Sequence, residues 1–231
     1  MSIAENIQEV RRRIQAAAGE AGRDPGEIIL VGASKMNDAA ACREAIAAGI
    51  DALGENRVQE MTAKLADNAY DGAPLHFIGH LQRNKVKQVV GKVALIQSVG
   101  SMELLEEIEK VAAREQLVQD ILLEVNIGRE EAKSGFDPDA VTAAAEAALS
   151  LPHVRVRGLM TIPPADADRD ANMRYFQEVQ ALYVDINTKL FHNELKCLSM
   201  GMSGDYMDAI RCGATMVRVG TAIFGARNYN I

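Results

Sequence analysis

A lysine that ends an apolar run is the first residue of this chain whose type and position suggest chemistry. Lys35 follows four consecutive apolar residues, 28–31, with turn residues on both sides, and this pattern predicts a buried strand. Because strand side chains alternate, Lys35 would share a face with Ile29, Val31 and Ala33. If that face points into a core, desolvation lowers the pKa of the lysine and favours the neutral amine that attacks a carbonyl. Considered alone, the strand also fits a lysine whose charged end extends into water.

Polar residues also follow other predicted strands. These strands are predicted at 51–56, 75–80, 93–99, 120–126, 154–160, 195–200 and 215–219. If the strands are parallel, their carboxyl ends share one rim, where the active sites of closed barrels lie. The polar residues expected at that rim are Lys35, Asn56, His80, Ser199, Ser203, Arg218 and Thr221, with weaker contributions near Ser98 and Asn126.

Two turns of small residues, 199–204 and 219–222, follow the last two predicted strands and each opens a helix. Glycine lets a backbone approach an anion closely, and unpaired N–H groups at a helix start can bind it. Ordinary strand-to-helix turns also contain Ser and Gly, so both interpretations stay open for these turns alone. The spacing of Gly220 and Gly225 matches a P-loop, but Ala226 and Arg227 replace its Lys-Ser/Thr pair, which argues against nucleotide binding.

A phosphate cradle opposite a strand-end lysine suggests a phosphorylated aldehyde held as a Schiff base. Pyridoxal 5'-phosphate is the common cofactor of this description. A phosphosugar aldolase that forms an imine on its own lysine is the other interpretation of the same residues.

The elements that position these residues alternate regularly. A capping box from Ser2 to Glu5 opens an N-terminal helix that runs to about Gly22. Further helices are predicted at 39–48, 58–65, 82–90, 102–115, 137–149, 173–190 and 206–211, with a short last helix opening at 220–225. Eight βα units without a linker predict an α/β fold, a (β/α)₈ barrel with an extra N-terminal helix and one domain over 1–231. The competing doubly wound open sheet would need a G-x-G-x-x-G turn after the first strand, and none is present.

Composition limits the partners and the compartment. The net charge of −7 argues against a nucleic-acid partner, and no apolar run is long enough to cross a membrane. Cys42, Cys197 and Cys212 are far apart, and no secretory signal is visible at the start, so we expect a cytoplasmic protein. His76 and His80 have a metal-ligand spacing that suits a helix, but they fall on a predicted strand, so no metal is expected.

Several motifs together carry a resemblance to a known family. They are Val31-x-Ala33-Ser34-Lys35, Gly54-Glu55-Asn56, Phe77-Ile78-Gly79-His80-Leu81-Gln82-x-Asn84-Lys85, Lys133-Ser134-Gly135, Arg157-Gly158-Leu159-Met160, Leu198-Ser199-Met200-Gly201-Met202-Ser203 and Val217-Arg218-Val219-Gly220-Thr221-Ala222-Ile223-Phe224-Gly225. The chain resembles the pyridoxal phosphate homeostasis protein family (the YggS/PROSC family) over nearly its whole length.

The resemblance implies an alanine-racemase-like barrel of PLP fold type III, with the cofactor bound to Lys35 as a Schiff base. It further implies that Ser203, Gly220 and Thr221 surround the phosphate and that Arg218 lies near the pyridine nitrogen. A cation there would keep that nitrogen unprotonated and weaken the ring as an electron sink. The full set of residues expected to bind the cofactor is Lys35, Asn56, His80, Ser199, Met202, Ser203, Arg218, Gly220 and Thr221.

Compared with alanine racemases, the chain is expected to lack the C-terminal β domain, which supplies a catalytic tyrosine. The tyrosines here do not match that position; they are Tyr70, Tyr175, Tyr183, Tyr206 and Tyr229. The resemblance therefore predicts a monomeric binding protein for intracellular PLP (vitamin B6) homeostasis without catalytic turnover, with transient contacts to apo PLP enzymes. A weak PLP-dependent amino-acid racemase is the alternative.

Overall fold

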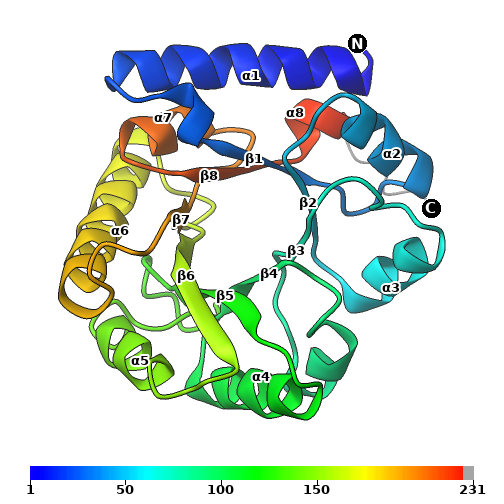
Figure 1. Cartoon of the computed structure of the whole chain (residues 1–231). Coiled ribbons are helices and arrows are strands. Elements are labelled where there is room, and N and C mark those ends of the chain that lie inside the picture. Colours follow the sequence, from blue (N-terminus) through cyan, green and yellow to red (C-terminus); the bar gives the residue numbers. More distant parts are fainter. Residues whose placement is uncertain (226–231) are drawn as a thin grey trace.

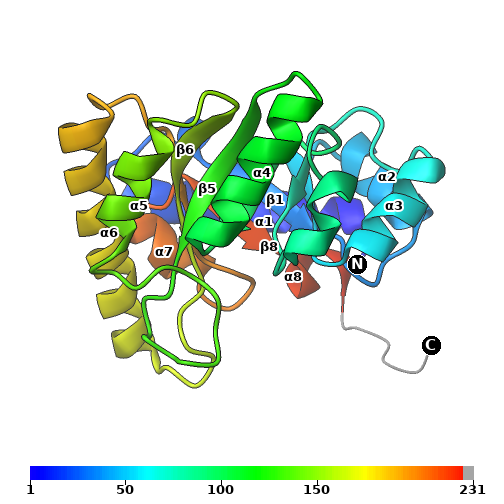
Figure 2. The same cartoon turned by 90° about the horizontal axis from the view of Figure 1, so that it is seen from below.

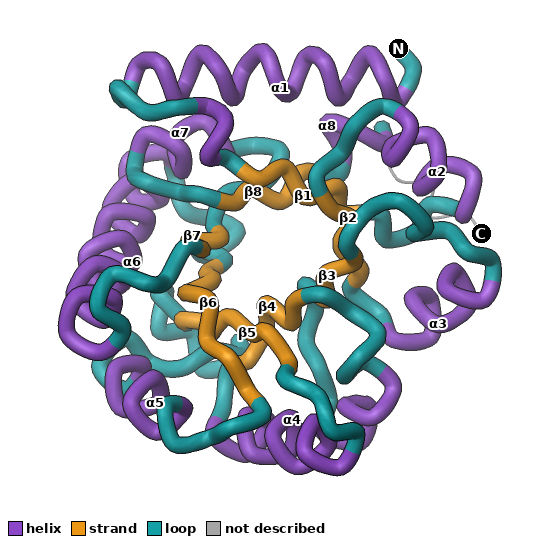
Figure 3. The backbone as a smooth tube through the Cα atoms, viewed as in Figure 1, coloured by secondary structure: helices purple, strands orange, loops and turns teal. Residues whose placement is uncertain are grey.

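Eight parallel strands form a closed barrel in the part of the chain that the structure, a computed structural model, describes, which is residues 1–225. The strands are β1 (Ile29–Ala33), β2 (Ala52–Glu55), β3 (Leu75–Phe77), β4 (Leu95–Val99), β5 (Gln119–Val125), β6 (Val154–Thr161), β7 (Cys197–Ser199) and β8 (Met216–Val219). Each pairs with its neighbour in chain order, and the parallel pairing of β1 with β8 closes the ring (Figure 3). The predicted (β/α)₈ barrel is therefore confirmed, and the open sheet is excluded.

Helices surround the barrel (Figure 1). They are α1 (Ile3–Glu20), α2 (Ala39–Ala47), α3 (Val58–Ala66), α4 (Met102–Arg114), α5 (Val141–Ala148), α6 (Arg169–Leu190), α7 (Tyr206–Arg211) and α8 (Thr221–Phe224), with 3-10 turns η1 (Pro25–Glu27) and η2 (Arg83–Gln88). The predicted extra N-terminal helix is α1, which begins with the predicted capping box between Ser2 and Glu5. Figure 1 shows α1 outside the barrel, beside α7 and α8.

Three helix predictions were wrong, one in the type of helix and two in where the helix begins. The segment predicted as a helix at 82–90 is the 3-10 turn η2. The helix predicted from Asp137 begins only at Val141, because the Asp137 carboxylate accepts the Asp139 amide and forms a local turn instead. In α6 the Asp168 side chain caps Ala171, so this helix begins at Arg169, four residues before the predicted start at 173.

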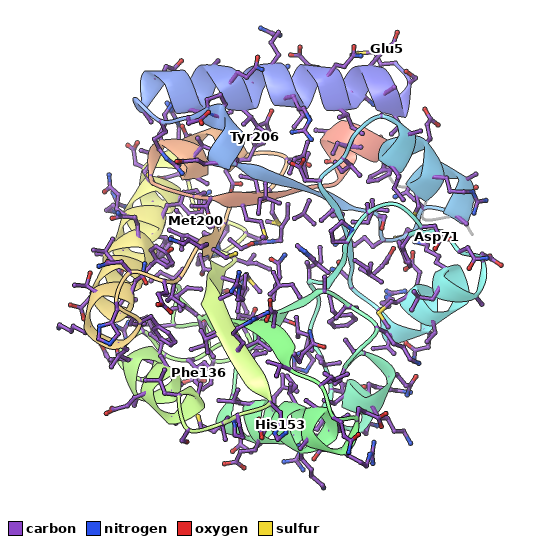
Figure 4. The ribbon with its side chains drawn as sticks, in the orientation of Figure 1. Glu5, Asp71, Phe136, His153, Met200 and Tyr206 are labelled. Carbon is purple, nitrogen blue, oxygen red and sulfur yellow. The ribbon has the colours of Figure 1, made fainter. Side chains whose placement is uncertain are left out.

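Two hydrophobic layers follow from the alternation of strand side chains. The outward faces pack against the helices and form the larger core. A smaller cluster fills the inside of the barrel and consists of Val31, Ala52, Leu95, Leu122, Met160 and Met216. Figure 4 draws the side chains on the ribbon and labels Tyr206, the first residue of α7, on the side of α1, and His153 beside α4. His153 Nδ1 lies 2.8 Å from Glu109 Oε1.

The loops after β5 and β6 extend from the same end of the barrel as α8 (Figure 2). Because all strands run in one direction, this is the carboxyl end of the sheet, where barrel sites are built. No helix between residues 1 and 225 combines the length and apolar character needed to cross a membrane. The sequence features at Ala226, Arg227 and Tyr229 lie outside the described residues.

Candidate functional site

A cavity of about 260 Å³ opens at the carboxyl ends of the strands. It is lined by Ala33, Lys35, Asn56, Ile78, Ile162, Met202, Ser203, Gly204, Arg218, Gly220 and Thr221. These residues come from the ends of β1, β2, β3, β6 and β8 and from the turns that follow β7 and β8. Most of its lining is apolar or neutral, with the cationic Arg218 and the amine-bearing Lys35 as exceptions.

The strand that precedes Lys35 carries its side chain to this cavity. Val31 belongs to the cluster inside the barrel, and Ile29 packs against it. Ala33 and Lys35 continue the same face and line the cavity, as the alternation of the strand predicts. Lys35 itself lies two residues beyond the end of β1 and is half-buried. The expectation that it reaches the rim of an apolar interior is met by this geometry.

Arg218 brings a buried positive charge to the floor of the cavity. Its side chain is 3% exposed, and burial lowers its pKa to about 10, so the guanidinium stays charged near neutral pH. Nη1 donates to Ser199 Oγ at 2.5 Å and Nη2 donates to the Thr161 carbonyl at 2.9 Å. These bonds use two of the five guanidinium N–H groups and fix its plane, leaving other N–H groups for a ligand.

A chain of buried hydrogen bonds continues from Arg218 into the barrel. The Ser199 hydroxyl donates to Gln97 Oε1 at 2.7 Å, and Gln97 Nε2 lies 3.0 Å from His76 Nδ1. Burial lowers the pKa of His76 to about 4, so the neutral ring accepts at Nδ1. This chain of hydrogen bonds orients the Arg218 guanidinium without adding a second charge beside it.

The turn after β7 places a hydroxyl against the start of α8. Ser203 Oγ accepts the backbone N–H groups of Gly220 at 3.1 Å and Ala222 at 3.3 Å. Gly201 has φ +91°, and a Cβ there would lie 2.6 Å from Ala209 Cβ, so only glycine suits this turn. Because the Ser203 oxygen accepts both of these N–H groups, its own O–H is left to donate to an anion at this edge of the cavity.

Asn56 contributes a polar atom that needs a partner. Its Oδ1 is buried and accepts no hydrogen bond from any residue in 1–225. The backbone at Gly79 packs closely against Asn56, since a Cβ on Gly79 would lie only 2.3 Å from the Asn56 carbonyl oxygen. Since Asn56 lines the cavity, a ligand hydroxyl or N–H group could satisfy this oxygen.

The cavity brings together seven of the nine residues expected at the site. They are Lys35, Asn56, Met202, Ser203, Arg218, Gly220 and Thr221. The other two lie elsewhere: Ser199 is fully buried below Arg218, and His80 is exposed beyond β3. The cavity is also lined by Ala33, Ile78, Ile162 and Gly204, which were not among the nine expected residues. Ala33 had been placed on the face of Lys35 by the alternation of the strand, and the same alternation could have indicated Ile78 and Ile162.

His76 and His80 do not form a pair of metal ligands. His76 is buried inside the barrel and bonded to Gln97, whereas His80 is exposed. Within residues 1–225, no three or more His, Cys, Asp or Glu side chains form a group that could hold a metal ion.

Comparison with known proteins first defines the class to which this barrel belongs. The model of the family described as "Alanine racemase, N-terminal domain" matches residues 2–228. An alanine racemase from Clostridium difficile 630 superposes with a TM-score of 0.72 at 15% identity, over 95% of this chain and 57% of that chain. This likeness shows the fold.

More similar proteins define the family within this class. A pyridoxal phosphate homeostasis protein from Aquifex aeolicus (strain VF5) is 42% identical over 229 residues, covering 99% of this chain and 100% of the relative. The structure of PipY from Synechococcus elongatus PCC7942, with PLP bound, superposes with a TM-score of 0.84 at 32% identity, over 97% of this chain and 100% of that chain. The chain belongs to the pyridoxal phosphate homeostasis protein family.

Proposed function

We propose that this protein binds pyridoxal 5'-phosphate in the cavity at the carboxyl end of the barrel and serves the homeostasis of this cofactor. The observation that carries the proposal is one cavity of about 260 Å³ in which Lys35, Arg218 and the Ser203 turn meet. This volume lies just below the range of about 300–1,000 Å³ that is typical of pockets for small ligands, so the cavity suits a compact cofactor. The names of the relatives and the PLP-bound PipY structure support the same ligand.

The residues of the cavity fit the parts of this cofactor. The hydroxyls of Ser203 and Thr221, beside the turn at Gly220, suit the phosphate, and Arg218 suits the pyridine nitrogen as a donor. Asn56 Oδ1, which has no partner within residues 1–225, suits a hydroxyl of the ring. Met202, which is 40% exposed, would cover one face of the ring at the entrance. We propose that Ser199 acts by holding the Arg218 guanidinium and does not contact the cofactor itself. His80 is an exposed residue, and we assign it no contact with the cofactor.

When bound, pyridoxal 5'-phosphate supplies an aldehyde carbon that a neutral lysine amine can attack. Lys35 supplies that amine in our proposal, and the apolar wall of Ala33, Ile78 and Ile162 excludes water around it. Arg218 would donate to the ring nitrogen and would keep a proton off it, because a second positive charge beside the guanidinium is unfavourable. An unprotonated ring withdraws electrons weakly, which opposes turnover of an amino acid.

We further propose a cofactor-binding protein without catalytic turnover. Apart from Lys35 and Arg218, the described residues that line the cavity carry no titratable side chain, so no second base is placed for racemisation. The proposal extends to a cytoplasmic monomer, with a single PLP-binding domain over 1–231, that contacts apo-enzymes transiently. The free cysteines Cys42, Cys197 and Cys212 are consistent with a reducing compartment.

Borohydride reduction of the protein loaded with pyridoxal 5'-phosphate tests the attachment. Peptide mapping should find the reduced cofactor on Lys35, and the Lys35→Ala variant should lose the label together with the visible absorbance band. Label on another lysine at full occupancy would overturn the assignment. The exchange of the α-hydrogen of alanine in deuterated water tests the racemase alternative; exchange above the Lys35→Ala control would contradict a protein without turnover.

A further inference from the structure

A buried ion cluster lies directly behind the segment that carries Lys35. Lys64, from α3, is 7% exposed, and Glu55, at the end of β2, is fully buried. Lys64 Nζ lies 2.7 Å from Glu55 Oε1 and 2.8 Å from Glu60 Oε1. Tyr70 OH also donates to Glu55 Oε1, at 3.1 Å. Removing two charged side chains from water costs several kcal/mol each, so a cluster of this kind requires compensation by specific contacts.

The cluster binds the backbone on both sides of Lys35. Lys64 Nζ donates to the Ser34 carbonyl at 2.9 Å, and the Met36 amide donates to Glu60 Oε1 at 2.5 Å. The Ser34 hydroxyl donates to Glu55 Oε1 at 2.6 Å. The residues before and after Lys35 are therefore both tied to one set of charges.

The contact to Glu60 also holds an unfavourable backbone conformation. Met36 has φ +63°, a left-handed conformation that costs a residue with a side chain roughly 1–2 kcal/mol. The Met36 side chain is 45% exposed, so packing of that side chain does little to offset the cost. Strain of this kind persists where surrounding contacts enforce it and is found at functional sites.

The second buried lysine cannot replace Lys35 as the amine. The three N–H groups of the Lys64 ammonium have three acceptors, namely Ser34 O, Glu55 Oε1 and Glu60 Oε1. Burial lowers the pKa of Lys64, but the two carboxylates outweigh it, so the pKa is raised overall and the group stays charged. The role left for Lys64 is structural support of the neighbouring segment.

We propose that Glu60 and Lys64, anchored by Glu55, are positioning residues that hold Ser34 and Met36 so that the Lys35 amine is directed into the cavity. The inference rests on the proposed function. A reacting group displaced by about 1 Å can react about a hundredfold more slowly, so small motions of this segment matter. The proposed phosphate donors lie on the turns after β7 and β8, whereas the cluster comes from β2 and α3, on the other side of β1. The cluster should therefore affect the attachment of the cofactor and leave its phosphate contacts intact.

Glu60 offers the test, because it lies at the edge of the cluster with its side chain 20% exposed. The Glu60→Ala variant removes the acceptor for the Met36 amide, whereas Glu60→Gln keeps an oxygen at that place. Gln59→Ala, an exposed position on the same helix, is the matched control. Two quantities are measured for each: the rate at which pyridoxal 5'-phosphate becomes reducible onto Lys35, and the affinity for inorganic phosphate measured by its competition with the cofactor.

We expect Glu60→Ala to slow attachment about tenfold with unchanged phosphate affinity, and Glu60→Gln and Gln59→Ala to stay near the wild-type rate. Attachment by Glu60→Ala at the wild-type rate overturns the inference. The inference is also overturned if Glu60→Ala loses phosphate affinity by the same factor as attachment rate. It is overturned as well if Glu60→Gln slows attachment as much as Glu60→Ala does. If the wild type itself does not attach the cofactor to Lys35, the proposed function fails instead, and the two failures are thereby distinguished.

Discussion

The Arg218 guanidinium donates through Nη1 to the Ser199 hydroxyl at 2.5 Å, deep inside the barrel. Ser199 is fully buried at the end of β7 and is not among the residues that line the cavity. Its hydroxyl donates onward to Gln97, so one small side chain links the charged floor of the site to the neutral interior. The orientation of Arg218, and with it the place for a ring nitrogen, depends on this contact.

Ser199→Ala is expected to lower the free energy of unfolding by about 2 kcal/mol. The substitution leaves an N–H group of a buried cation and the Gln97 carbonyl oxygen without partners, and bonds to charged groups contribute about 1.5–3 kcal/mol each. Urea denaturation measures the change. Ser150→Ala, at an exposed serine, is the control and should change stability little. An unaltered midpoint for Ser199→Ala would show that Arg218 finds another acceptor.

Ser203→Ala is expected to weaken the binding of pyridoxal 5'-phosphate roughly tenfold or more and to leave pyridoxal unaffected. The hydroxyl lies 3.1 Å from the Gly220 amide, and a lost hydrogen bond to a charged group costs about 1.5–3 kcal/mol. Titration with both aldehydes, followed by absorbance, measures the two affinities. An equal loss for both aldehydes would remove Ser203 from the phosphate site.

Gly79→Ala is expected to displace Asn56 and to weaken cofactor binding. The new Cβ would lie 2.3 Å from the Asn56 carbonyl oxygen and 2.6 Å from its Cα, so the backbone must move. Overpacking of this kind costs about 1–3 kcal/mol of stability. Thermal unfolding and cofactor titration measure both effects. Gly19→Ala is the control with the opposite sign, because its Cβ meets open space in α1 and should stabilise the helix by up to about 1 kcal/mol.

The buried His76 is expected to lower the free energy of unfolding in mild acid. Its pKa falls from 6.5 to about 4 in the folded protein because of burial, so between these values the unfolded chain binds the extra proton. Stability therefore falls as the pH decreases from 6.5 to 4, by roughly 3 kcal/mol from this group. Denaturant unfolding across this range measures the slope.

The slope attributed to His76 should be smaller in His76→Asn, whose Oδ1 can still accept from Gln97 but does not titrate there. His192→Asn, at an exposed histidine, is the control and should retain the slope of the wild type. If His76→Asn follows the same pH dependence as the wild type, other groups control stability in acid.

Much of the fold could be predicted because its signals are local. The apolar run that ends in Lys35, the Ser2–Glu5 capping box and eight alternating units depend on residues close in sequence. Helix starts were predicted less well where local contacts compete. The turn that the Asp137 carboxylate forms with Asp139 delays α5 until Val141, and no periodicity in the sequence reveals it.

Residue types at strand ends predicted most of the cofactor site, the family resemblance added Met202 and Gly220, and the tertiary structure decided which of them meet. Seven of the nine expected residues line the cavity, but Ser199 lies below Arg218, because a side chain within a strand points into the barrel before the rim is reached. His80 lies beyond its strand, where the chain has already turned into solvent.

The amino-acid sequence by itself indicated a barrel with a strand-end lysine facing small-residue turns, since these features are properties of short segments. The resemblance carried by its motifs then favoured pyridoxal phosphate over a phosphosugar. Only the tertiary structure decided how the amine is held. Glu55, Glu60 and Lys64 reach Ser34 and Met36 from another strand and helix, 21 to 30 residues away along the chain. These charges meet only when β1 pairs with β2 and α3 packs beside them, because no local pattern can specify a hydrogen bond across neighbouring units.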